Sequence, residues 1–170
     1  MAAGVILVEL HNRLIGLDDK GNLVLNTSGI MPGNTGQTPF VVGKNIPSTI
    51  AISAAKGASA NICNVTFQVQ DALGNSLSGN FAFDVLLSDS ATGFGLTATT
   101  PSGGVAAATS GGTVLGVDTT SKAVFVQTNS SGAFVLAITD TAKTLFYPVA
   151  LGFNQFPAFV GAQLATANYT

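Results

Sequence analysis

The sequence predicts an all-β protein whose larger part is a β-sandwich, preceded by an extended N-terminal β arm or a small β-layer. Apolar and polar residues alternate along several segments, and clusters of turn residues separate these segments at short intervals. Strict alternation interrupted by turns is the pattern of an all-β chain, because successive side chains of a strand point to opposite faces. No window of the sequence shows a convincing helical period.

The clearest strand is predicted over residues 62–70. Its apolar side chains, from Cys63 to Val69, fall on one face, and Asn64, Thr66, Gln68 and Gln70 fall on the other. The apolar set is therefore expected to face a core. The same alternation recurs over residues 81–88 and 134–138. Further strands are predicted at residues 122–128, 145–151 and 158–164.

The predicted turns have residue types that favour them. Residues 71–75 and 129–132 each begin with Asp or Asn and carry a Gly where a positive φ is expected. Residues 18–22 predict a hairpin that joins Leu14–Leu17 to Leu23–Leu25. Residues 97–112 are rich in Gly, Ala, Ser and Thr, which predicts a long loop that could lie on a neighbouring molecule.

The sequence predicts two regions, divided near residue 56. Residues 1–56 contain a short hairpin followed by scattered Pro and Gly, which is too broken to enclose a core alone. Residues 57–170 contain about seven strand candidates, which is the number in a β-sandwich.

Scarcity of charge is the most unusual feature of the composition. Only 8% of the residues are charged, against roughly 25% in an ordinary soluble domain. No apolar stretch is long enough for a membrane-spanning helix, and no basic segment of a signal peptide is present. The net charge of -2 and the scattered Lys and Arg residues argue against nucleic-acid binding. A weakly charged surface is typical of an assembly subunit, although a secreted or fibrous β-protein remains an alternative.

The candidate catalytic and metal-binding residues all have simpler interpretations. His11 is the one histidine and no Gly-x-Ser-x-Gly elbow accompanies it, so a hydrolase triad is not expected. Asp140-Thr-Ala142 is interpreted as a turn cap, and Asp18, Asp19 and Asn22 lack the ligand pattern of an EF-hand. Cys63 is expected to pack in the core. The sequence therefore predicts a non-enzymatic protein without a cofactor or metal.

Several segments resemble immunoglobulin-like domains. Residues 65–79 (VTFQVQDALGNSLSG) and 127–139 (QTNSSGAFVLAIT) resemble bacterial immunoglobulin-like domains of the Big/invasin type. Residues 85–93, 99–105 and 138–147 resemble a phage and prophage version of this domain that occurs in virion structural proteins. The resemblance covers about residues 60–164 and implies an immunoglobulin-like sandwich in a bacteriophage particle. It implies no catalytic site.

The function expected from this resemblance is that of a capsid decoration (cement) protein. Such a protein would be made in the host cytoplasm and would bind the outside of the shell, where its partner is the major capsid protein. It would be a homo-oligomer, with a trimer suggested by analogy, and it would bind neither nucleic acid nor a membrane. The alternatives are a tail, neck or fibre component of the virion, or an immunoglobulin-like adhesin module that binds a host surface.

The expected contact surface consists of apolar residues near the N-terminus and phenylalanines near the C-terminus. Burying apolar area across a subunit junction contributes roughly 25 cal/mol per Å² before the costs of association are subtracted. The predicted contact residues are Val5, Ile6, Leu7, Val8, Ile30, Met31, Phe40, Val41, Phe153, Phe156 and Phe159.

Overall fold

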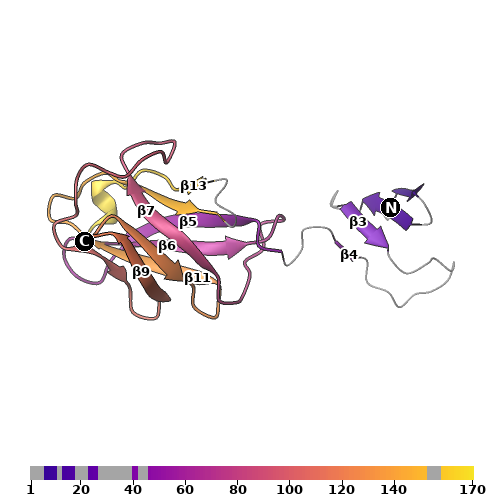
Figure 1. The fold of residues 1–170 in the computed structure, drawn as a ribbon, viewed down its shortest axis with the longest axis horizontal. Helices are drawn as coiled ribbons and strands as arrows, with labels where there is room; N and C mark the ends of the chain where they lie inside the picture. Colours follow the sequence, from indigo (N-terminus) through magenta and orange to yellow (C-terminus); the bar gives the residue numbers. More distant parts are fainter. Residues whose placement is uncertain (1–5, 11–12, 18–22, 27–39, 42–45, 153–157) are drawn as a thin grey trace. The chain divides into compact units, whose positions relative to one another are not determined.

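The computed structural model describes residues 6–10, 13–17, 23–26, 40–41, 46–152 and 158–170. Contacts between Cα atoms divide the chain into two compact units, residues 1–44 and residues 45–170 (Figure 1). The described elements are antiparallel strands and one short 3-10 helix, η1 (Thr166–Asn168). The predicted all-β fold is confirmed.

The N-terminal unit contains a four-stranded antiparallel sheet with the order β1-β2-β3-β4. The predicted hairpin is present, because β2 pairs with β3 and places Leu17 opposite Leu23. The strands of this sheet are β1 (Ile6–Leu10), β2 (Arg13–Leu17), β3 (Leu23–Asn26) and β4 (Phe40–Val41).

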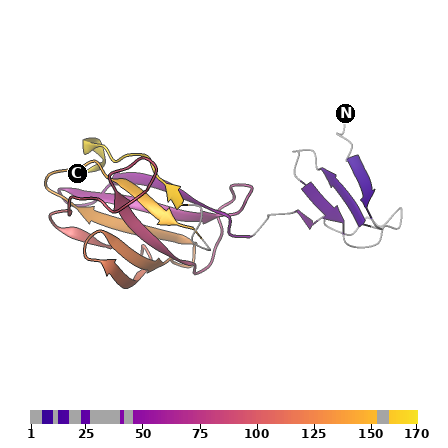
Figure 2. The same cartoon turned by 45° about the horizontal axis from the view of Figure 1, so that its top comes forward.

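The second unit is a β-sandwich of two antiparallel sheets, seen from two directions in Figures 1 and 2. The four-stranded sheet has the order β5 (Thr49–Lys56), β6 (Ile62–Gln70), β11 (Ala133–Thr139), β8 (Gly104–Ala107). The five-stranded sheet has the order β13 (Ala158–Val160), β12 (Tyr147–Leu151), β7 (Ala82–Ser88), β10 (Ala123–Gln127), β9 (Thr113–Thr119).

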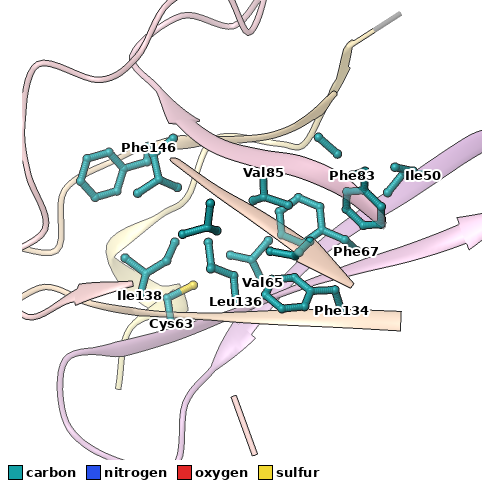
Figure 3. Close-up of a cluster of buried hydrophobic side chains, with 14 of the residues drawn as sticks. Ile50, Cys63, Val65, Phe67, Phe83, Val85, Phe134, Leu136, Ile138 and Phe146 are labelled. Atoms are coloured by element: carbon teal, nitrogen blue, oxygen red, sulfur yellow. The ribbon is translucent and has the colours of Figure 1, made fainter. Parts of the chain in front are cut away.

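The core lies between the inner faces of these two sheets (Figure 3). Strands β6 and β11 alternate strictly, with every second side chain buried, as their sequence pattern predicts. Phe67 lies at the centre, and its ring centroid is 6.4 Å from that of Phe83 and 6.4 Å from that of Phe134. Both ring pairs are tilted, which is a favourable arrangement for aromatic rings.

Two parts of the sandwich differ from the sequence-based expectation. Residues 49–56 were placed in the N-terminal region, but they form β5 and pair along their whole length with β6. Their alternation is weak because the inward residues Ile50, Ile52 and Ala54 differ in size, and β5 is an edge strand. Residues 97–112 were expected to form a loop, but β8 lies within them and pairs with β11. The sequence of β8 consists of small residues and shows no alternation of polar and apolar side chains. The strand is recognised only by its pairing with β11.

The turns at Asp71 and Asn129 have the expected chemistry. Asp71 Oδ1 accepts hydrogen bonds from the backbone N–H groups of Leu73 and Asn75, both at 2.9 Å. Asn129 Oδ1 accepts from the backbone N–H of Ser131 at 3.0 Å, and Gly132 has a φ of 74°. A Cβ atom at Gly132 would lie 1.8 Å from the carbonyl oxygen of Leu77, so the close approach of two backbones requires glycine there.

Gly132→Ala is therefore expected to destabilise the sandwich by at least about 2 kcal/mol, because both the positive φ and the clash oppose a side chain. Gly74→Ala is the matched control. Gly74 also has a positive φ, 80°, but a Cβ atom there would meet nothing within 4 Å. Its cost should be about 1 kcal/mol, from the backbone conformation alone. Urea unfolding monitored by circular dichroism measures both values, and equal costs would contradict the close-approach argument.

Candidate interaction surfaces

Asp140 caps a turn, as the sequence analysis expected. It is buried after β11, and its carboxylate accepts hydrogen bonds from the backbone N–H groups of Ser102 (3.2 Å), Ala142 (3.4 Å) and Thr144 (2.8 Å). Burial by itself would raise the pKa of Asp140, but the hydrogen bonds from Thr144, Ser102 and Ala142 outweigh it and lower the pKa below its ordinary value. The carboxylate therefore fixes the conformation of the loops on either side of it.

Cys63 is a core residue, as expected. Its thiol is buried, and burial raises its pKa to about 11, so it is neutral and unreactive near pH 7. Tyr169 is buried in the same core cluster and donates a hydrogen bond from its hydroxyl to the carbonyl oxygen of Thr144 at 2.9 Å. Burial, followed by the negative charges of Cys63, whose thiol ionises only at high pH, and of Asp140, raises the pKa of Tyr169. The C-terminal segment is thereby anchored in the core.

The remaining acidic residues of the sandwich do not converge on one site. Asp89 accepts from Thr97 Oγ1 at 2.6 Å and from the backbone N–H of Ala98 at 2.8 Å, and these bonds together with Lys122 lower its pKa. Burial raises the pKa of Asp84, and the neighbouring Asp118 raises it further. Among the described residues, no group of three or more His, Cys, Asp or Glu side chains could hold a metal ion. His11, Asp18, Asp19 and Asn22 lie outside the described residues.

The predicted contact residues are only partly covered by the structure. Ile6, Leu7 and Val8 lie in β1, and Phe40 and Val41 form β4, although their side chains are not described. Phe159 lies on β13, where it is half-buried and packs against the core cluster. Val5, Ile30, Met31, Phe153 and Phe156 lie outside the described residues.

The outer surface of the four-stranded sheet carries no charged side chain, and we call it the neutral face. The strand registers place Ser53, Thr66 and Val135 in one row across it, at the middle of the sheet. The polar face predicted for residues 62–70 forms its centre, whereas β5 and β8 were not expected. The outward side chains of the neutral face are Thr49, Ala51, Ser53, Ala55, Ile62, Asn64, Thr66, Gln68, Gln70, Ala106, Ala133, Val135, Ala137 and Thr139.

Apart from Lys56 at the end of β5, the described charged side chains of the sandwich lie away from the neutral face. Asp84 and Asp118 belong to strands of the five-stranded sheet, and Lys122 donates to the carbonyl oxygens of Thr97 (3.0 Å) and Ala98 (2.9 Å) in the loop that follows β7. Several large apolar side chains are exposed on the same sheet and loop, namely Phe94, Leu96, Leu115, Val117 and Phe125. The two sheets thus present surfaces of different character.

A hollow of about 160 Å³ lies beside β5. Ile52, Ser53 and Ala54 form the part of its wall that belongs to β5, and every residue around it is uncharged. The other lining residues are Pro148, Ala162, Gln163 and Asn168. The hollow is therefore lined jointly by β5 and the C-terminal segment, which also contact each other through β13 and η1.

No family model, curated protein or solved structure matches the chain. In the part of the chain that the structure describes, there is no helix with the length and apolar character needed to cross a membrane. The candidate sites therefore rest on the geometry of the sandwich itself.

Asp140 makes the stability of the sandwich dependent on pH. Because its folded pKa is lowered, its contribution is present above the unfolded value of about 3.9 and is lost as the pH falls through the folded pKa. Asp140→Asn loses a charged acceptor and should destabilise by about 1–3 kcal/mol at pH 7, with a smaller difference at pH 3. Urea midpoints at the two pH values measure this.

The matched control is Lys56→Gln, which removes a charge from an exposed residue at the end of β5. It should change the free energy of unfolding by less than about 0.5 kcal/mol at pH 7. An Asp140→Asn effect that does not diminish at pH 3 would contradict the role assigned to the charge.

Proposed function

We propose that the chain is a bacteriophage capsid decoration protein and that it binds the major capsid protein through the neutral face. The observation that carries the proposal is a sheet surface with fourteen outward side chains, none of them charged, and with one charge at its border, Lys56 at the end of β5. The resemblance of residues 60–164 to phage virion domains supplies the setting. The proposal concerns a binding and stabilising role without catalysis.

The neutral face is suited to burial against a protein partner. Removing a charged side chain from water is costly unless it is paired, whereas Ala, Thr and Ser on a flat sheet carry a much smaller penalty. From strand spacing and rise, four strands of this length present roughly 450 Å². A standard interface buries about 800 Å² on each partner, so this face alone makes a weak contact.

Weak contacts suffice when a chain binds at more than one point. The N-terminal unit, with the predicted contacts Val5–Val8 and Ile30–Val42, would be a second contact point on the same chain. Two linked contacts raise the overall affinity because the second forms at a high effective concentration. A decoration protein that clamps adjacent capsid subunits would use this effect.

The strand order supports the immunoglobulin-like part of the resemblance. If the β9–β10 hairpin is set aside, the sheets have the orders β5-β6-β11-β8 and β13-β12-β7. In chain order these correspond to strands A-B-E-D and G-F-C of a constant-type immunoglobulin domain. The hairpin then extends the second sheet next to β7.

The test is binding to expanded, empty phage capsids that lack decoration protein. The purified chain should co-sediment with the capsids in a saturable way and raise their disruption temperature. Thr66→Lys places a charge at the centre of the neutral face and should weaken binding roughly tenfold or more, since an unpaired charge would be buried. Sedimentation with increasing protein concentration measures the change.

Thr113→Lys is the matched control, because Thr113 is exposed on β9 in the other sheet. It should bind like the original chain. Failure of the original chain to bind any expanded capsid would contradict the proposal. A copy number of a few dozen or fewer per particle would favour a tail, neck or fibre component instead.

A further inference from the structure

The sandwich has four edge strands, and three of them are poorly suited to pair with another strand. Strands β8 and β13 are short, with four and three residues. Strand β9 has register shifts at two points opposite β10, which bend the edge. Short strands and bulges are ways in which proteins protect sheet edges from pairing with other chains.

The fourth edge, β5, is neither short nor bulged, and β13 and the helix η1 lie close to it. Strand β5 is eight residues long and keeps a continuous register with β6 from Thr49 to Lys56. It contains no Pro, no bulge and no charge before its last residue, Lys56. A long, regular and uncharged edge is the kind that accepts an additional strand.

The backbone groups that β5 directs outward follow from its pairing. The N–H of Gly57 donates to the carbonyl oxygen of Ile62, and the N–H of Val69 donates to Gly132 on the opposite side of β6. Hydrogen-bonding direction alternates along an antiparallel pair. The residues of β5 that face away from β6 are therefore Ile50, Ile52, Ala54 and Lys56. Within residues 46–152 and 158–170, no hydrogen bond to their backbone groups is found.

We propose that β5 pairs with β5 of a second copy, antiparallel and about a twofold axis at Ser53. This register places Ile52 opposite Ala54 of the other copy and Ile50 opposite Lys56. All four outward-facing residues of each strand then meet outward-facing residues of the other, which satisfies their hydrogen bonds.

A second copy fits this edge better than a charged partner does. The paired side chains are small or aliphatic, and Lys56 is the one charged residue of the strand. In the proposed register the two Lys56 residues are about 20 Å apart along the strands, so they do not repel each other appreciably. A partner strand rich in acidic or basic residues would find no complementary charge along β5.

The pairing also changes the size of the neutral face. Two four-stranded sheets joined at β5 form one continuous sheet, and the outer surface grows from roughly 450 Å² to roughly 900 Å². The larger value exceeds the 800 Å² or so that a standard interface buries on each partner. Pairing does not depend on the proposed function, because it occurs between copies of the chain alone.

The experiment measures association of the full chain in solution, without capsids, by sedimentation velocity over a range of concentrations. The original chain should form dimers. Ser53→Lys places two like charges opposite each other at the axis, in a pair whose Cα atoms are about 4.5 Å apart, and should raise the dissociation constant roughly fivefold or more.

Ala55→Lys is the matched control. It adds the same charge to an exposed residue of the same strand, but the two lysines would be about 13 Å apart, so the dissociation constant should change by less than about twofold. Ala54→Pro removes an outward-facing N–H that does not bond to β6 and should weaken the dimer more than Ser53→Lys does. Thermal unfolding confirms that each variant folds.

Mixing Ser53→Lys with Ser53→Glu should restore dimers, because opposite charges then meet at the axis. A monomeric or trimeric original chain, equal effects of Ser53→Lys and Ala55→Lys, or no rescue in the mixture would each overturn the β5 pairing. Capsid binding by a chain that stays monomeric would leave the proposed function standing and refute this inference alone. A dimer that binds no capsid would support the β5 pairing and contradict the proposed function.

Discussion

The structure of the sandwich depends on burying one apolar face from each of two sheets. Strand β6 supplies the largest continuous part of that face, from Cys63 to Val69, and β11 extends it through Phe134, Leu136 and Ile138. Phe83 and Val85 of β7 close over it from the other sheet. Because a strand points its side chains alternately to opposite faces, the same constraint that fills the core also determines what the outer surface carries.

Buried polar groups hold the loops against this core. Asp71, Asp140 and Thr128 are all buried, and each makes several hydrogen bonds to backbone groups. A buried carboxylate without partners would be costly, so these bonds fix the conformations of the loops around them. No buried side-chain nitrogen or oxygen of the described residues lacks a hydrogen-bond partner. The buried acidic residues Asp71 and Asp140 thus both have a structural role.

The scarcity of charge can be located on the structure when the surfaces of the two sheets are considered one at a time. A low overall charge indicates only that a protein is suited to contact others. The structure places no charged side chain on one flat sheet surface and leaves β5, at the border of that surface, as a long regular edge that ends at Lys56. A neutral sheet surface beside a long, regular edge supports the proposed function, which requires extended contact with a partner rather than a pocket.

The sequence by itself determined the all-β class, the strands at residues 62–70 and 134–138, the turns at Asp71 and Asn129, and the burial of Cys63. These features are local, because strand alternation and turn formation depend on residues that are close together in the sequence. Only the tertiary structure decided that Thr49–Lys56 belongs to the sandwich, that Gly104–Ala107 is a strand, and which sheet each strand joins. Those features depend on hydrogen bonds between segments far apart in the chain. Small residues such as Ala and Ser have only a weak preference for strands, so the sequence does not predict these pairings.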